Sequence, residues 1–349
     1  MKEAEPLLRI KDLSTHFFTY SGVVKALDGI SLEVAKEKDS LGLVGETGCG
    51  KSVTALSVMR LIPQPPGRIV QGEIWFNDED LLKKKEKYMQ QEIRGRRISM
   101  IFQEPMTSLN PVIRISDQIM EALLLHPESN GNQISSSVKI GDLSKSTRKR
   151  LKQETRERAI ELLNLTGIPD PEEVATRYPH QLSGGMRQRV MISIALACNP
   201  QLLIADEPTT ALDVTIQAQI LALIKELREK IGVSLLLITH HLGLVSAMCN
   251  RVAVMYAGTI VEYTELRSLF KNPIHPYTKG LFKCIPRLGV KREKQLSTIR
   301  GTVPDLINPP TGCRFHPRCD EQKSLCRNTK PLLMEVENGH FVACHCHAC

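Results

Sequence analysis

The stretch that decides the fold is Gly45-Glu46-Thr47-Gly48-Cys49-Gly50-Lys51-Ser52, which we call the glycine loop. The apolar run 41–44 before it predicts a buried strand, and residues 53–60 after it predict a helix. Glycines let the backbone wrap closely, so that successive N–H groups and the positive end of the following helix face an anion. The pattern Gly-x4-Gly-Lys-Ser therefore predicts a phosphate-binding loop. In it, Lys51 would neutralise the β- and γ-phosphates and the Ser52 hydroxyl would hold Mg²⁺.

Two adjacent carboxylates follow a second apolar run, residues 202–205. At the end of a buried strand, Asp206 is expected to reach the Mg²⁺ ion of a bound nucleotide. Glu207 is placed to polarise the attacking water as general base. The alternative is an acidic surface turn before Pro208. Together with the glycine loop, the carboxylate pair favours a nucleoside triphosphatase.

The remaining hydrophobic pattern predicts an α/β fold. Apolar strands at 98–102, 202–205 and 233–239 alternate with helical segments, which is typical of a parallel core covered by helices. Residues 7–10 and 30–34 alternate apolar and polar residues, as edge strands do. Residues 116–189 have mostly helical periodicity and read as an insertion into the core.

Composition limits the class of protein. The chain has 349 residues, a net charge of +8 and a charged fraction of 24%, which is ordinary for a globular protein. Its basic runs include residues 83–87, 94–97 and 145–158. They are interpreted as solvated helix faces, with an anionic membrane or nucleic acid as alternatives. No aromatic residues interleave these runs, as a single-strand binder would need. No signal peptide or apolar stretch of about 20 residues is visible, so we expect a cytoplasmic chain that meets the membrane through partners.

Cysteines are concentrated near the C-terminus. Of the ten in the chain, six lie after residue 312, namely Cys313, Cys319, Cys326, Cys344, Cys346 and Cys349. A disulfide framework is not expected in a chain without a secretory signal. The cluster therefore indicates metal or redox chemistry.

Several further motifs resemble those of the ATP-binding cassette (ABC) family, and the resemblance covers essentially the whole chain. The segment Leu182-Ser183-Gly184-Gly185-Met186 resembles the family's signature motif. The others occur in the family's order: Phe17 for the aromatic on adenine, Gln103 for the Q-loop, Leu212 and Asp213 for the D-loop, and His240 for the switch histidine.

The resemblance implies a P-loop NTPase (ABC ATPase) core with an antiparallel β subdomain, a helical insertion and a small Cys-rich C-terminal extension. The nucleotide-binding domain would comprise residues 1–262, with the helical subdomain at about 104–190. Residues 263–349 would form the extension, where the hydrophobic pattern gives way to Pro-rich and Cys-rich sequence.

The same resemblance assigns roles in ATP hydrolysis. Phe17, the glycine loop and Asp206 would bind ATP, and Ser52, Gln103 and Asp206 would hold Mg²⁺. His240 would contact the γ-phosphate and hold the water that Glu207 activates. From side-chain chemistry alone, His240 could equally be a buried structural histidine.

The signature motif has anion-binding chemistry of its own. Ser183, Gly184 and Gly185 precede a helix, so they offer a hydroxyl, bare N–H groups and a helix N-terminus. In the family this motif caps the γ-phosphate bound to the other subunit, so that two ATP molecules are sandwiched between two cassettes.

Two features depart from the family pattern. His241 stands where an acidic residue is usual, and residues 36–40 lack the usual glycine in the turn before the glycine-loop strand. Asp39 could take that turn instead.

Longer motifs resemble the oligopeptide/dipeptide/nickel import branch of the family. They are residues 103–111, 178–181, 275–278 and 312–319. This implies an ATPase that powers import of a di- or oligopeptide, or a related solute, from the cytoplasmic face of the cell (inner) membrane. Its partners would be an identical or homologous ATPase, two membrane permeases and an extracytoplasmic solute-binding protein, without nucleic acid. Nickel or glutathione import and a soluble nucleic-acid-associated ABC ATPase are the alternatives.

Four tail cysteines have counterparts in that branch. Cys313, Cys319, Cys326 and Cys344 match positions that hold an iron–sulfur cluster ([4Fe-4S]) in several members. Their spacing is not that of a zinc ribbon, but zinc remains an alternative because His316, His345 and His347 lie nearby in the sequence. Reduced structural thiols are the third interpretation. The family pattern assigns nothing to Cys346 and Cys349.

Overall fold

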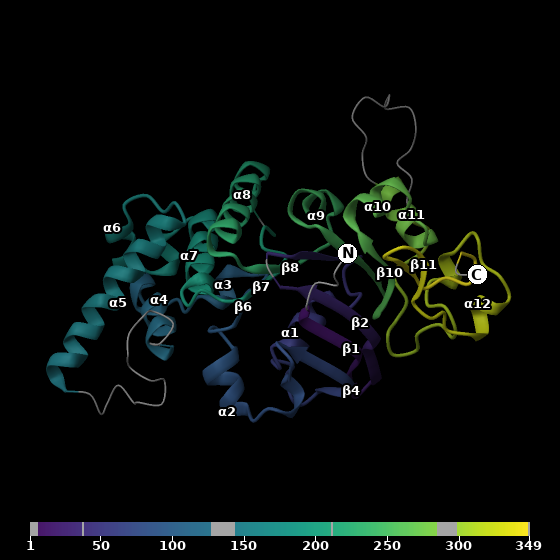
Figure 1. Ribbon diagram of the computed structural model, residues 1–349, viewed down its shortest axis with the longest axis horizontal. Helices are drawn as coiled ribbons and strands as arrows, with labels where there is room; N and C mark the ends of the chain where they lie inside the picture. Colours follow the sequence, from purple (N-terminus) through teal and green to yellow (C-terminus); the bar gives the residue numbers. More distant parts are fainter. Residues whose placement is uncertain (1–5, 37, 127–143, 211, 285–298, 348–349) are drawn as a thin grey trace. The chain divides into compact units, whose positions relative to one another are not determined.

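The computed structural model describes residues 6–36, 38–126, 144–210, 212–284 and 299–347 (Figure 1). By its internal contacts the chain divides into two compact units. The first contains residues up to 35, residues 40–82 and residues from 237 onward. The second contains residues 36–39 and 83–236. Each is described by itself.

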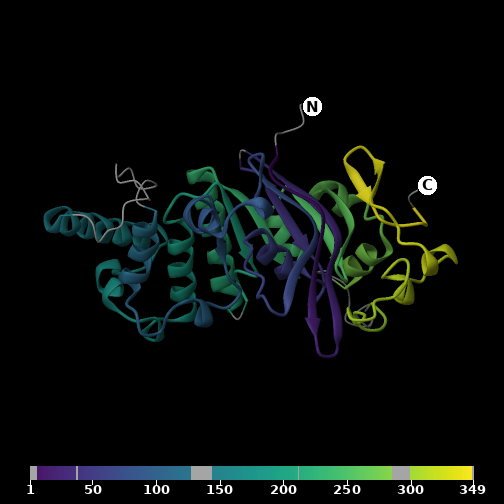
Figure 2. The same ribbon diagram turned by 90° about the horizontal axis from the view of Figure 1, so that it is seen from below.

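An antiparallel sheet opens the first unit. Its strand order is β2 (Gly22–Ala35), β1 (Pro6–Thr19), β4 (Gly67–Phe76) and β5 (Glu79–Asp80), and β1 and β2 form the long hairpin of Figure 2. The prediction that residues 7–10 form an edge strand is wrong, because β1 lies between β2 and β4. Register shifts near Leu13 place three consecutive buried residues, 13–15, in β1. Because each bulge interrupts the alternation of buried and exposed residues, the sequence pattern does not show how long the strand is.

A second sheet of the first unit carries the glycine loop. Here β3 (Ser40–Val44) pairs in parallel with β9 (Arg251–Tyr256), and β10 (Thr259–Glu265) pairs with β9. Beyond β10 lie β12 (His340–Val342) and β11 (Met334–Glu337). The C-terminal residues, whose sequence lacks clear periodicity, thus add two strands to the sheet that contains β3. The same region contains three short helices (Figure 1). Two follow β10, namely α10 (Leu266–Lys271) and α11 (Pro276–Lys283), and α12 (Leu325–Asn328) precedes β11.

The second unit is mostly helical, as the sequence predicts. Its helices include α4 (Ile115–Leu125), α5 (Lys145–Leu165), α6 (Pro171–Thr176), α7 (Gly184–Leu196) and α8 (Val214–Ile231). Leu151, Thr155, Ala159 and Leu162 of α5 are buried at helical spacing, which explains how so polar a helix packs. Strand β6 (Ile98–Ile101) pairs in parallel with β7 (Leu202–Asp206). Strand β8 (Ser234–Thr239) carries the chain from this unit into the first.

The turn before β3 differs from the prediction. The residue with the left-handed backbone is Lys38, at φ 66°, rather than Asp39. The backbone carbonyl of Asp39 accepts a hydrogen bond from Leu235 N–H at 2.8 Å. A side chain in the left-handed region costs about 1 kcal/mol, which is the reason glycine is usual in such a turn.

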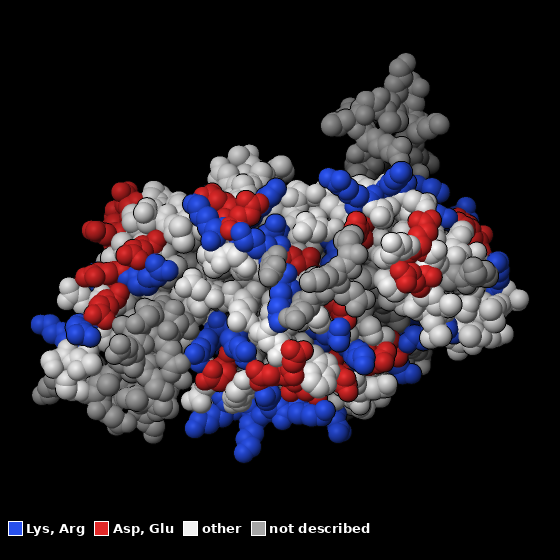
Figure 3. Space-filling view, in the orientation of Figure 1, with Lys and Arg blue, Asp and Glu red and all other residues white. Residues whose placement is uncertain are grey.

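The basic runs lie among acidic partners on the surface. Figure 3 shows Lys and Arg interspersed with Asp and Glu over much of the face in view. In the run 145–158, Arg150 pairs with Glu154 at 3.2 Å and Arg158 pairs with Glu161 at 2.9 Å. These pairs fit the interpretation of solvated helix faces. Within the described residues, no helix combines the length and apolar character needed to cross a bilayer.

A buried carboxylate anchors the C-terminal residues to β10. Glu262 is fully buried and accepts hydrogen bonds from Ile274 N–H at 2.8 Å and His275 N–H at 3.0 Å. Its other contact is with His340 Nε2 on β12, at 2.7 Å. One side chain thus links three segments, which is how a buried carboxylate is normally accommodated.

His275 should make the stability of the protein depend on pH. Its Nδ1 accepts from Tyr277 N–H at 3.0 Å at the start of α11. Burial, followed by the charges of His347 and Lys279, lowers the pKa of His275 to about 3. Between pH 6.5 and 3 the unfolded chain therefore binds a proton that the native state excludes. The stabilising effect of neutral His275 is complete above pH 6.5 and is lost at up to about 1.4 kcal/mol per pH unit as the pH falls.

Urea unfolding of the His275→Asn variant at pH 7, 6, 5 and 4 tests this expectation. Asparagine keeps a capping acceptor but does not titrate. The free energy of unfolding of the variant should fall less steeply with acid than that of the wild type. The exposed His180→Asn substitution is the control and should leave the slope unchanged. Parallel pH profiles for wild type and His275→Asn would contradict the assignment.

Candidate functional site

The glycine loop joins β3 to α1 (Lys51–Val58) in a tightly packed turn. Gly50 begins the helix with a left-handed φ of 107°. A Cβ on Gly50 would lie 2.6 Å from the Ala26 carbonyl oxygen, and one on Gly45 would lie 2.1 Å from the Met255 carbonyl oxygen. Both positions therefore require glycine, because the loop is pressed against neighbouring backbone.

Lys51 folds back over the loop. The residue is 5% exposed, and its Nζ donates to the carbonyl oxygens of Gly45 at 2.8 Å and Glu46 at 2.9 Å. Ser52, beside it, is half-buried. Burial raises the pKa of the Cys49 thiol, so this loop cysteine stays protonated and packs as a small apolar group. The loop thus presents one cation and a run of backbone N–H groups, the chemistry of a phosphate site.

Two other predicted residues belong to the first unit. Phe17 is half-buried on β1, where it pairs in register with Val24 on β2 and Gly67 on β4. His240 is exposed immediately after β8. His241 N–H donates to Thr239 Oγ1 at 3.1 Å, and His241 is the N-cap residue of α9 (Leu242–Met248). The His241 side chain makes no capping hydrogen bond, so this contact at the start of α9 is through the backbone alone.

The carboxylate pair stands at the end of β7 in the second unit. Asp206 is 4% exposed, and Glu207 follows with a left-handed φ of 44°. Gln103 Nε2 donates to Glu207 Oε2 at 3.2 Å, and Thr210 Oγ1 donates to the same oxygen at 3.1 Å. The structure thus brings together Gln103 and Glu207, which are 104 positions apart in the sequence. An acidic surface turn would not bury Asp206.

The signature segment and the D-loop residues also meet in the second unit. Ser183 caps α7, its Oγ accepting from Met186 N–H at 3.3 Å, and Leu182 before it is buried. Asp213 caps α8 by accepting from Ile216 N–H at 2.9 Å. A Cβ on Gly184 would lie 3.4 Å from Leu212 Cδ2, and one on Gly185 would lie 2.8 Å from Ile216 Cγ2. The two helix N-termini are therefore held close together by glycines.

The tail cysteines that the structure describes are not arranged around one metal ion. Cys313, Cys319, Cys326, Cys344 and Cys346 all have free thiols, and burial raises the pKa of Cys313 and of Cys319 to about 11. In the part of the chain that the structure describes, no three His, Cys, Asp or Glu side chains are arranged to hold one metal ion. As placed, these residues do not fit the predicted iron–sulfur cluster or zinc. Cys349 lies outside the described residues.

Sequence reasoning missed the residues that hold Glu46. Arg318 and Tyr277, both from the C-terminal residues, contact this loop residue. The motifs 275–278 and 312–319 contain them, but neither motif by itself indicates a contact with the glycine loop. Their positions depend on pairing over more than 200 residues, which no local pattern encodes.

Comparison with known proteins identifies two regions of the chain. The family described as "ABC transporter" matches residues 27–210. The family described as "Oligopeptide/dipeptide transporter, C-terminal region" matches residues 261–326. Together these matches cover the glycine loop, the carboxylate pair, the signature segment and most of the C-terminal residues.

Similar proteins extend over the full length. A probable peptide ABC transporter ATP-binding protein of Sinorhizobium fredii is 47% identical, over 98% of this chain and 95% of its own. The oligopeptide transport ATP-binding protein OppD of Bacillus subtilis is 47% identical over 96% and 87%. The dipeptide transport ATP-binding protein DppD of Escherichia coli is 45% identical over 97% and 96%.

A solved structure supports the fold. The ATP-binding cassette MJ0796 in a dimeric post-hydrolysis state matches with a TM-score of 0.60 at 23% identity, over 74% of this chain and 99% of that one. The family matches, the full-length relatives and the fold agree. The chain therefore belongs to the ABC transporter family, as an ATP-binding protein of its oligopeptide/dipeptide branch.

Proposed function

We propose that this ATPase powers the import of di- or oligopeptides. The observation that carries the proposal is the presence in one chain of an ABC cassette and the oligopeptide/dipeptide C-terminal region. The relatives named above, which match over nearly the whole chain, are named for peptide transport. In this proposal residues 1–262 form the cassette, with a helical subdomain at 104–190, and residues 263–349 form the extension.

The glycine loop would hold the ATP phosphates, with the adenine stacked on Phe17. Its N–H groups and the Lys51 ammonium offset the phosphate charge. Ser52, Gln103 and Asp206 offer the oxygen donors that Mg²⁺ prefers. When bound, Mg²⁺ would neutralise the β- and γ-phosphate oxygens.

Glu207 would accept the proton of the attacking water. The hydrogen bonds from Gln103 and Thr210 to Oε2 support this role, because they fix the orientation of the carboxylate. His240 would contact the γ-phosphate. Gln103 would report the state of this site to the helical subdomain, since it touches Glu207 and leads into α3 (Pro105–Ser108).

The signature segment would complete the site of a second cassette. It combines the Ser183 hydroxyl, two glycines and the N-terminus of α7, a helix of 13 residues. Leu212 and Asp213 would face the partner at the same surface. ATP would then be enclosed only when an identical or homologous ATPase closes over it.

Reconstitution tests the transport role. We propose that two permeases hold the chain at the cytoplasmic face of the membrane and that an extracytoplasmic binding protein delivers the peptide. In proteoliposomes, the permeases with peptide-loaded binding protein should raise ATP hydrolysis about tenfold, because closure of the cassettes is then coupled to the permeases. Vesicles without permeases are the control. Stimulation by DNA or RNA instead of permeases would favour a nucleic-acid-associated ATPase.

The metal assignment of the tail rests on the family resemblance alone and stays a prediction. Protein purified without oxygen can be analysed for iron and zinc. An iron–sulfur cluster bound by Cys313, Cys319, Cys326 and Cys344 would give a brown protein with broad absorbance near ~400 nm. A colourless protein with stoichiometric zinc would support the zinc site. Protein without either metal would support the third interpretation, in which the cysteines are reduced structural thiols.

A further inference from the structure

Glu46 is where the C-terminal extension touches the glycine loop. Three of its polar groups have partners: the carboxylate binds Arg318, the backbone N–H donates to Tyr277, and the carbonyl accepts from Lys51. The first two partners come from the extension, and the third is the cation of the loop. All four residues lie in the first unit. Glu46 therefore links the extension to Lys51, the lysine that we propose binds the phosphates.

The contact with Arg318 is bidentate and partly buried. Its two terminal nitrogens lie 2.7 Å and 3.1 Å from the two carboxylate oxygens of Glu46. The side chains of Arg318 and Glu46 are 6% and 28% exposed. Arg318 Nε also donates to the Arg300 carbonyl at 2.7 Å, and the guanidinium lies 5.7 Å from the centre of the Tyr256 ring. Such a planar, multiply held guanidinium fixes its partner in direction as well as distance.

Tyr277 holds the backbone of the same residue. Its hydroxyl oxygen accepts from Glu46 N–H at 3.0 Å, and the ring is fully buried. Tyr256 and Phe315 pack against it, with ring centres 4.7 Å and 5.4 Å away. The packed aromatic rings thus fix the Tyr277 hydroxyl that holds the backbone N–H of Glu46.

Lys51 depends on the position that these contacts give to Glu46. Its Nζ is 2.9 Å from the Glu46 carbonyl and 2.8 Å from that of Gly45. A shift of Glu46 would therefore move one of the groups that orient the ammonium. Small displacements of an oriented cation weaken its interaction with a bound anion.

We infer that Arg318 and Tyr277 are positioning residues for the glycine loop, through which the C-terminal extension sets the affinity for nucleotide. The inference rests on the proposed role of this loop in binding ATP. Neither residue is assigned to contact nucleotide. Their effect should be a change in nucleotide affinity, with the rate at saturation nearly preserved.

Nucleotide titration of the full chain tests the inference. In Arg318→Gln, the Kd for MgATP and MgADP should rise about tenfold and the KM in parallel. The kcat at saturating ATP should stay within about twofold of wild type. Arg318→Lys should recover part of the affinity, because it restores the charge without the bidentate geometry.

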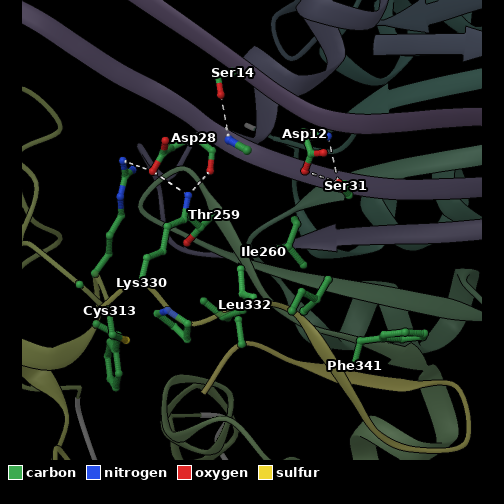
Figure 4. A pocket seen from close by; sticks show the side chains of 18 of the residues that line it. Asp12, Ser14, Asp28, Ser31, Thr259, Ile260, Cys313, Lys330, Leu332 and Phe341 are labelled. Atoms are coloured by element: carbon green, nitrogen blue, oxygen red, sulfur yellow. Dashed lines mark hydrogen bonds and ion pairs between the residues drawn. The ribbon is translucent and has the colours of Figure 1, made fainter. Parts of the chain in front are cut away.

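The matched control is Lys330, a second basic residue of the extension that pairs with a carboxylate. Lys330 lies 2.9 Å from Asp28 Oδ2 and also donates to the Asp28 carbonyl at 2.8 Å (Figure 4). It secures the extension to β2 without touching the loop. Lys330→Gln should leave the nucleotide Kd unchanged. If Lys330→Gln raises the Kd as much as Arg318→Gln, or if Arg318→Gln binds like wild type, the inference is wrong.

A double substitution separates a direct contact from a general loss of stability. If Arg318 acts through the Glu46 carboxylate, Glu46→Gln with Arg318→Gln should raise the Kd no further than Arg318→Gln alone. If the Kd of the double variant instead rises by the product of the two single-variant effects, the inference is wrong. Wild-type protein that fails to bind nucleotide would instead refute the proposed function, so the two failures are distinguishable.

Discussion

Replacing Glu207 with glutamine is expected to lower ATP hydrolysis by about a hundredfold or more while preserving ATP binding. Glutamine keeps the size of the side chain and can still accept from Gln103 and Thr210. It cannot accept a proton from water at neutral pH. Phosphate release measured beside nucleotide binding gives the comparison. Size-exclusion chromatography should also show an ATP-dependent dimer that persists, because the closed state no longer hydrolyses its nucleotide.

The control for this substitution is Glu226→Gln on α8. Glu226 is an exposed carboxylate of the same unit, paired with Lys230 at 2.6 Å. The Glu226→Gln variant should hydrolyse ATP at the wild-type rate. Unaltered turnover in Glu207→Gln would falsify the assignment of the general base.

The Lys51→Ala variant should lose MgATP binding and hydrolysis together. Lys51 supplies the only side-chain ammonium of residues 45–52, and a charge-assisted contact with phosphate is among the stronger hydrogen bonds. We expect the Kd for MgATP to rise about a hundredfold, which corresponds to ~2.7 kcal/mol. Titration with a fluorescent nucleotide analogue measures this directly. Thermal unfolding provides a second readout, because MgATP should raise the Tm of wild type but not of the variant.

The exposed Lys225→Ala on α8 is the matched control for Lys51 and should bind MgATP like wild type. A Lys51→Ala protein that keeps wild-type affinity would show that the glycine loop is not the phosphate site. The contrast with Glu207→Gln is informative, since one variant should fail at binding and the other at hydrolysis.

The local parts of the site could be predicted from the sequence because their signals are short-range. The glycine loop, the strand ending in Asp206 and the cap at Ser183 each lie within a few consecutive residues. In such segments the turn, the helix start and the side chain that uses them are encoded together. The structure confirms a strand before the loop and a helix after it.

Other features depend on pairing between distant segments. The contact of Arg318 with Glu46 spans 272 positions, and Arg318 lies in a Pro-rich and Cys-rich region without periodicity. The strands β11 and β12 are too short to stand out in the sequence. Lys38 has a left-handed backbone conformation, which glycine or asparagine would usually adopt. These features depend on contacts between segments that are far apart in the sequence. A local sequence pattern does not reveal such contacts.

The central claim is that a complete ATP site needs two cassettes, and mixing two inactive variants tests it most directly. Lys51→Ala would disable the glycine loop, and Ser183→Arg would block the signature segment. Each variant alone should be inactive. In a mixed dimer, one site joins an intact loop to an intact signature, so the mixture should recover up to about a quarter of the wild-type rate. A mixture no more active than the sum of the separate variants would contradict a two-cassette site formed by two copies of this chain.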